Sequence, residues 1–163
     1  MKQLAFSLGD RRKRAVADTV CSILDNKGYD VVSISPMATV YEAIAEMARM
    51  EVGALVVLSG RNLVGIVSER DYARKVILRG KSSKDTVVGE IMTPSPVTVR
   101  LSDTVDECMR IVTEKRIRHL PVVDDDELKG MISIGDLVKT IISAQSYTID
   151  QLHTYIGSDY PSP

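Results

Sequence analysis

The spacing of apolar residues changes from a helical period to a strand period twice along this chain. In the first half, Val40, Ile44 and Met47 lie three to four residues apart, which is typical of a helix with one buried face. The β-branched runs 54–58 and 63–67 follow, separated by a polar turn. This part of the chain is therefore predicted to form a helix and two short strands.

The second half shows the same order of patterns. Val105, Met109 and Val112 have the helical spacing, and the apolar runs 119–123 and 128–132 flank another polar turn. A second helix with two strands is therefore predicted here.

The two halves also match residue by residue. When residues 32–72 are shifted by 65 positions, they align with residues 97–137 without a gap, and ten positions are identical. The identical pairs are Val32/Val97, Thr39/Thr104, Val40/Val105, Glu42/Glu107, Leu55/Leu120, Val57/Val122, Leu63/Leu128, Gly65/Gly130, Ser68/Ser133 and Asp71/Asp136. A repeat of fixed period sets the architecture, so the same fold is predicted twice.

The start of the long helix in each repeat carries a capping signal. Thr39 precedes Glu42 by three residues, and Thr104 precedes Glu107 by the same distance. In this spacing the threonine and the acid satisfy free backbone amides at a helix start. Both helices are therefore predicted to begin directly after the threonine.

Each repeat is predicted to open with an extended run and to close with a helix. The opening runs are residues 31–34 and 97–99, and the closing helices cover about residues 72–78 and 137–142. The order in each repeat is thus β-α-β-β-α, which places the chain in the α/β class.

The length of 163 residues is usual for one domain. Two halves of about 60 residues would be marginal alone, so the repeats are expected to share a single core. The predicted organisation is a lead-in over residues 1–18, repeats over 19–80 and 85–145, and a tail over 146–163 with a short helix and a frayed end.

Composition narrows the class of partner. The formal net charge is −1 and the chain has one Phe, six Tyr and no Trp, which argues against nucleic acid as the main partner. No apolar stretch approaches the ~18 residues that span a bilayer, so no membrane partner is expected. The basic run 11–14 is predicted to be a solvated surface segment rather than a docking site for an anionic partner.

The cysteines and histidines do not form a recognisable catalytic or metal pattern. Cys21 and Cys108 make no disulfide framework, and Cys108 falls on the apolar helical stripe, as a small core residue would. Two cysteines without a disulfide framework favour a reducing, cytoplasmic setting. The two histidines, His119 and His153, are far from each other and from the cysteines in sequence. The chain is therefore predicted not to be an enzyme and to hold no metal.

Each repeat ends in the pattern Gly-x-x-Ser-x-x-Asp, where a strand meets a helix. Such a junction exposes backbone amides that suit a phosphate, the hydroxyl of Ser68 or Ser133 adds a donor, and Asp71 or Asp136 suits the two hydroxyls of a ribose. Ser-x-x-Asp is also a capping box that needs no ligand. The two interpretations are compatible, because a capped helix start still presents amides.

The whole repeat, with its Gly-hydrophobic-hydrophobic-Ser-x-x-Asp ending, resembles the CBS (cystathionine beta-synthase) domain. The resemblance covers about residues 19–144 and rests also on residues 90–93 and 118–124. Two such domains in tandem form a Bateman module, and the chain is similar to small stand-alone two-CBS proteins of bacteria.

The resemblance implies that the two repeats pack sheet to sheet around a pseudo-twofold axis, with two clefts between them. It implies clefts that bind adenosyl ligands such as AMP, ATP, NAD(H) or S-adenosylmethionine, without catalytic residues or a catalytic cofactor. It further implies a homodimer that senses cellular energy or redox state and regulates an unidentified partner protein. The alternative is a protein-interaction scaffold whose nucleotide clefts do not function.

The resemblance also assigns residues to the two clefts. In one cleft Asp136 would hold the ribose, Ser133, Arg118 and His119 would face the phosphate, and Met131, Val52 and Gly53 would enclose the adenine. In the other cleft Asp71 would hold the ribose, Ser68 and Arg70 would face the phosphate, and Ile66, Ile117 and Thr93 would line the base pocket. Because Gly53 and Ala54 stand where the second repeat has Arg118 and His119, the clefts are expected to differ in affinity or ligand.

Overall fold

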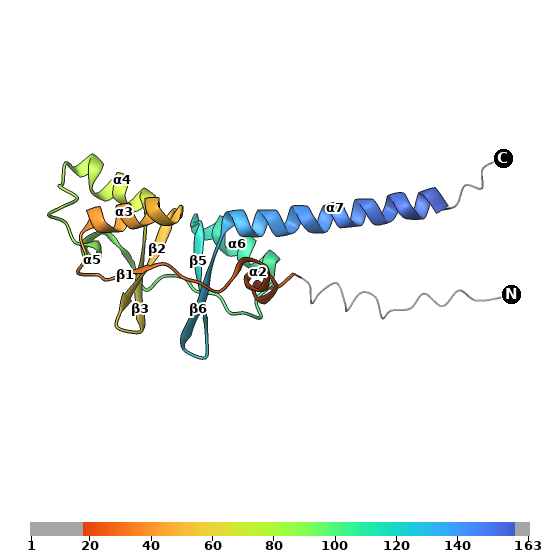
Figure 1. Ribbon diagram of the computed structural model, residues 1–163, viewed down its shortest axis with the longest axis horizontal. Coiled ribbons are helices and arrows are strands. Elements are labelled where there is room, and N and C mark those ends of the chain that lie inside the picture. The colour runs from red at the N-terminus through yellow and green to blue at the C-terminus, as the bar shows by residue number, and fades with distance from the viewer. Residues whose placement is uncertain (1–17, 159–163) are drawn as a thin grey trace.

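The computed structural model describes residues 18–158, with side chains for residues 18–150. The first helix of the described part is α2 (Val20–Lys27). The first repeat contains β1 (Ser33–Ile34), α3 (Val40–Met50), β2 (Ala54–Ser59), β3 (Asn62–Ser68), α4 (Glu69–Lys75) and the short 3-10 helix η1 (Ile77–Arg79). A connection with α5 (Val88–Ile91) and β4 (Thr93–Pro94) leads to the second repeat, which contains α6 (Val105–Lys115), β5 (His119–Asp124), β6 (Glu127–Ser133) and α7 (Ile134–Ser158). The two repeats lie side by side along the long axis of the molecule (Figure 1).

The predicted duplication is confirmed down to strand register. β2 pairs with β3 and β5 with β6, both antiparallel, and the pair Leu55↔Val67 corresponds to Leu120↔Ile132. The predicted capping boxes are also present. The hydroxyls of Thr39 and Thr104 each accept the amide three residues on, at 3.2 Å.

The opening strands are shorter than predicted, and the two sheets differ in size. β1 covers only two residues and pairs in parallel with β2, and the first sheet has the order β1-β2-β3-β4. In the second repeat the opening run is reduced to a single parallel bridge between Val99 and Val122, so that sheet has two strands.

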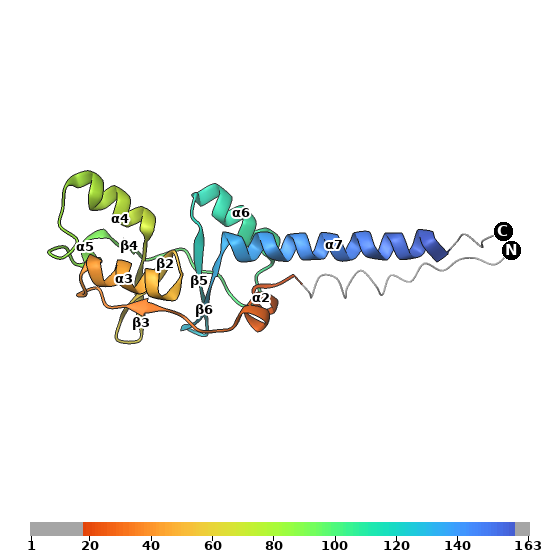
Figure 2. The same cartoon turned by 45° about the horizontal axis from the view of Figure 1, so that its top comes forward.

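The expectation of a single shared core is wrong, because the described residues form two hydrophobic clusters. Each cluster is completed by a helix from the segment that precedes the other repeat. Leu24 of α2 packs with Leu120 and Ile132 of the second repeat, whereas Ile91 of α5 packs with Leu55 and Val67 of the first. Figure 2 shows α2 beside the second repeat and α5 at the far end of the first. Neither repeat is complete without the helix that comes from outside it.

This exchange explains the glycine in each repeat motif. A Cβ atom added at Gly130 would lie 2.7 Å from Cδ1 of Leu24 in α2. A Cβ atom at Gly65 would lie 2.5 Å from the sulfur of Met92 and 3.0 Å from the carbonyl oxygen of Thr93. Both glycines therefore stand where the exchanged segment lies against the sheet, and a side chain has no room there.

The closing helices differ from their predicted bounds. α4 and α7 begin directly after Ser68 and Ser133, three residues earlier than expected, because these serines act as caps. The predicted short tail helix is part of α7, which continues unbroken to Ser158. No Gly or Pro occurs between residues 137 and 156 to end it. The lead-in before Asp18, its basic run 11–14 and the predicted frayed end after Ser158 lie outside the described residues.

Candidate functional site

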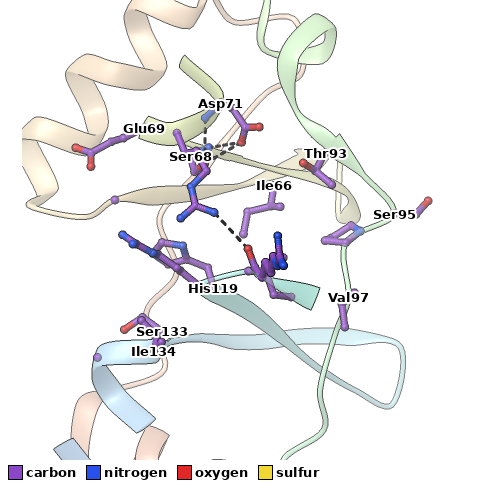
Figure 3. A pocket seen from close by; sticks show the side chains of 17 residues that line it. Ile66, Ser68, Glu69, Asp71, Thr93, Ser95, Val97, His119, Ser133 and Ile134 are labelled. Carbon is purple, nitrogen blue, oxygen red and sulfur yellow. Dashed lines mark hydrogen bonds between the residues drawn. The ribbon is translucent and has the colours of Figure 1, made fainter. Parts of the chain in front are cut away.

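A cavity of about 480 Å³ lies between the two repeats. Its volume is within the usual range for small-molecule sites. Figure 3 shows Ser68 and Asp71 at one end, Ser133 and Ile134 at the other, and Ile66 and His119 between them. The full lining is Gly53, Ile66, Ser68, Glu69, Arg70, Asp71, Thr93, Ser95, Pro96, Val97, Arg116, Ile117, Arg118, His119, Ser133, Ile134 and Gly135. Both repeats and the connection between them thus contribute to one site.

Asp71 is held in place by the start of α4. Its Oδ2 accepts the backbone amide of Ser68 at 3.0 Å and the Ser68 hydroxyl at 2.9 Å, while its Oδ1 lies 2.8 Å from Nζ of Lys75. Lys75 also donates to the carbonyl of Ile91, at 2.7 Å. A carboxylate offers about four acceptor positions, so Asp71 keeps capacity for a further donor.

The cavity wall is rich in cationic groups. Arg70 comes from α4, whereas Arg116, Arg118 and His119 come from the end of α6 and the start of β5. Nη1 of Arg70 donates to the carbonyl of Arg116 at 3.2 Å, which joins the two repeats across the cavity. Three guanidinium groups around one cavity suit a ligand with phosphate groups.

His119 is held in its neutral form. Burial lowers its pKa below the ordinary histidine value, and the charges of Lys27 and Arg118 lower it further, against an opposing effect of Asp136. The neutral ring faces Gly53, since a Cβ atom at Gly53 would lie 3.7 Å from its Cε1 and Nε2 atoms. At neutral pH the ring therefore offers one donor and one acceptor.

The remaining wall is largely apolar. Ile66 and Ile117 come from different repeats, and Thr93, Pro96 and Val97 come from the connection between them. Figure 3 shows Thr93 and Val97 along one side, with Ile66 opposite. A flat aromatic ring can be enclosed between such surfaces.

Asp136 has a different environment from its counterpart Asp71. Its Oδ2 accepts Nζ of Lys27 at 2.7 Å, the amide of Ser133 at 2.7 Å and the Ser133 hydroxyl at 3.0 Å. Burial favours a higher pKa for Asp136, but the hydrogen bonds from Lys27 and from the Ser133 backbone outweigh it, so the pKa is lowered. Lys27 also donates to the carbonyl of Met131, at 2.8 Å. The lysine of α2 thus bridges the Asp136 carboxylate and the Met131 carbonyl.

The structure gathers most of the sequence-predicted site residues around one cavity. The residues assigned to the Asp71 cleft all line it, namely Asp71, Ser68, Arg70, Ile66, Ile117 and Thr93. Four residues assigned to the other cleft line it as well, namely Ser133, Arg118, His119 and Gly53. Asp136, Met131 and Val52 are absent from its lining, because Asp136 and the Met131 carbonyl face Lys27 and Val52 packs against the first core.

Sequence reasoning missed several residues of the site. Arg116 ends α6 in the left-handed conformation (φ 55°), as Glu51 ends α3 at the equivalent repeat position (φ 54°). Of the aligned repeats, the first has an acid, Glu51, where the second has a base, Arg116. This difference in charge could have identified Arg116 as a candidate site residue. Lys27 had no such signal, because it lies more than 100 residues from Asp136 in sequence.

Two further properties of the described part of the chain bear on the class of protein. Between residues 18 and 150, no three His, Cys, Asp or Glu side chains group together as metal ligands would. Within the same described part, every helix is too short or too polar to cross a bilayer.

Comparison with known proteins assigns the chain to a family. The CBS domain model matches residues 24–77 and 88–143, which are the two repeats. The chain therefore belongs to the CBS domain family, with two CBS domains in tandem.

Individual relatives show how close the similarity is. The chain is 42% identical over 127 residues to the CBS domain-containing protein CBSX3, mitochondrial, of Arabidopsis thaliana, and the match covers 75% of this chain and 62% of that protein. A CBS-domain protein structure from Burkholderia ambifaria MC40-6 is 49% identical with a TM-score of 0.76, over 78% of this chain and 96% of that one. The CBS domain protein PAE2072 from Pyrobaculum aerophilum, solved in complex with AMP, is 30% identical with a TM-score of 0.65, over 72% of this chain and 88% of that one.

Proposed function

We propose that this chain is a regulatory module that binds an adenine nucleotide in the cavity between its repeats and passes the binding signal to a partner protein. The observation that carries the proposal is that one cavity combines the Asp71 carboxylate with three arginines and an apolar wall. The AMP complex of a similar CBS-domain protein supports the same class of ligand.

Each part of the cavity suits one part of a nucleotide. The remaining acceptor position of Asp71 suits a ribose hydroxyl. Arg70, Arg116 and Arg118 suit the phosphate groups, and AMP, ATP and NAD(H) all carry them. The adenine ring would lie between Ile66, Ile117 and the connection.

The same placement offers a mechanism of regulation. A nucleotide held by Asp71 of the first repeat and Arg118 of the second bridges the repeats, so it favours the relative arrangement in which both contacts form. The coupling equals the difference in affinity between arrangements, typically ~1–3 kcal/mol. The module would sense the energy state if AMP or ATP binds best, and the redox state if NAD(H) does.

Exposed apolar residues support the proposed homodimer. Val138 and Ile142, one turn apart on α7, are 40% and 57% exposed. Pairing of this surface with a second copy would bury them. A cytoplasmic location stays a prediction.

A ligand panel tests the proposed function. Thermal unfolding is measured with AMP, ATP, NADH and adenosine, and a true ligand at 100 times its dissociation constant stabilises by ~2.7 kcal/mol. The phosphate-bearing compounds are expected to raise the unfolding temperature more than adenosine does. Arg118→Gln should reduce that difference, whereas Arg110→Gln, an exposed arginine outside the cavity, should preserve it. If none of the compounds stabilises the protein, the scaffold alternative is favoured instead.

A further inference from the structure

A second hollow lies on the other side of the second repeat, away from the nucleotide cavity. It measures about 420 Å³ and lies between the start of α6 and the middle of α7. We name it the α6–α7 groove, and its lining is Asp18, Val105, Asp106, Thr140, Ile141, Ala144, Gln145, Thr148 and Ile149. Its floor is mostly apolar, and Asp18 and Asp106 place two acids beside it.

We propose that residues 1–17 of this same chain dock in the α6–α7 groove. The described chain starts at Asp18, which is itself part of the groove lining. Its carbonyl accepts the amide of Val105 at 2.8 Å, and Val20 donates to the carbonyl of Asp103 at 2.9 Å. Backbone hydrogen bonds therefore fix Asp18, where the segment joins, at the edge of the groove.

The chemistry of the segment complements that of the groove. Residues 1–17 contain Phe6 and Val16 among other apolar residues, and the basic run 11–14 with only one acid, Asp10. Apolar side chains suit the floor formed by Ile141 and Ala144. The basic run, which the sequence alone predicts to be solvated, would instead lie beside the nearby acids.

The length of the segment is sufficient. The α7 part of the lining extends from Thr140 to Ile149, which is about 14 Å of helix. Seventeen residues extend about 56 Å when fully stretched and about 25 Å as a helix, so either form covers the groove.

Tethering favours this occupant over a second copy. A segment joined directly to the edge of its binding site has an effective concentration on the order of millimolar. A second molecule at micromolar concentration is therefore at a disadvantage of about a thousandfold for the same surface.

Limited proteolysis of the full chain tests the proposal. Trypsin cleaves after the basic residues 11–14, and docking would protect them, so the cleavage rate follows the undocked population. Ala144→Arg places a bulky cation in the groove and should raise the cleavage rate about tenfold or more. Ser146→Arg, on the opposite face of α7 and outside the groove lining, should leave the rate unchanged.

The competing outcomes are distinct. Equal cleavage rates in the wild type and both variants would show that the segment does not dock. Protection that disappears when the protein is diluted would assign the groove to a second copy and would also overturn the proposal. An unchanged unfolding temperature of Ala144→Arg shows that faster cleavage does not come from general unfolding.

Discussion

Lys27 of α2 donates to Asp136 of the second repeat at 2.7 Å, across more than 100 residues of sequence. The equivalent aspartate of the first repeat, Asp71, pairs instead with Lys75 of its own helix, at 2.8 Å. The two equivalent aspartates thus pair with different lysines, one from α2 and one from the helix that carries the aspartate itself. Only Asp71 lines the cavity between the repeats, so the duplicated aspartates have different surroundings.

Lys27→Gln is expected to destabilise the fold in a pH-dependent way. The lowered pKa of Asp136 contributes stability above the unfolded value of ~3.9, and this contribution is lost as the pH falls through the folded pKa. Both side chains are partly exposed, so the expected loss at pH 7 is only about 1 kcal/mol. Urea unfolding at pH 7 and pH 3 should show a difference between wild type and variant that shrinks at pH 3. A difference of equal size at both pH values would show that the ion pair is not its source.

Gly130→Ala tests the exchange of helices between repeats. The new methyl group would lie 2.7 Å from Cδ1 of the fully buried Leu24 of α2, so a loss of about 1–3 kcal/mol is expected. The double variant Gly130→Ala/Leu24→Val should lose less stability than the two single variants lose together, because valine leaves room for the new methyl group. Gly135→Ala is the control, because its nearest neighbour would be the Ser133 hydroxyl oxygen at an ordinary 3.5 Å. Strict additivity of Gly130→Ala and Leu24→Val in chemical denaturation would contradict the packing of α2 on the second repeat.

His119 should make both stability and ligand binding depend on pH near 6. Its folded pKa is lowered, so the unfolded chain binds a proton first, and stability falls as the pH drops below ~6.5. His119→Gln should remove this decline in the ligand-free protein.

A phosphate beside His119 would favour the charged ring. The nucleotide affinity of the wild type, divided by that of His119→Gln, should therefore rise as the pH is lowered from 8 to 5.5. Taking the ratio cancels the titration of the nucleotide itself. A ratio that stays constant over this range would place the phosphate away from His119.

Local features of the fold were predictable from sequence, whereas long-range contacts were not. The caps at Thr39 and Thr104 and the paired strands follow from short-range spacing, which the repeat confirms independently. The position of α2 could not be predicted in this way, because the apolar residues of α2 would suit the core of either repeat. The contact of Leu24 with the surface beside Gly130 exists only once the chain is folded.

The candidate site was predictable as a set of residues but not as a geometry. The repeat motif identified Ser68 and Asp71, and the family resemblance added Arg118 and His119. Their meeting around a single cavity depends on how the repeats face each other, which residue spacing does not contain. Arg116 reaches the cavity from a left-handed helix end, and the change from Glu51 to Arg116 between the aligned repeats was the only sequence signal that pointed to it.

A calorimetric titration of AMP into the wild type and Asp71→Asn tests the central claim most directly. Asparagine keeps a carbonyl that can accept the Ser68 amide, so α4 stays capped, but it loses the charge and one acceptor oxygen. The account predicts that AMP binds the wild type and binds Asp71→Asn about 10 to 150 times more weakly, or ~1.5–3 kcal/mol. Asp126→Asn, in the exposed turn between β5 and β6, should bind as the wild type does. Equal AMP affinity of all three proteins would contradict the assignment of Asp71 to the ribose.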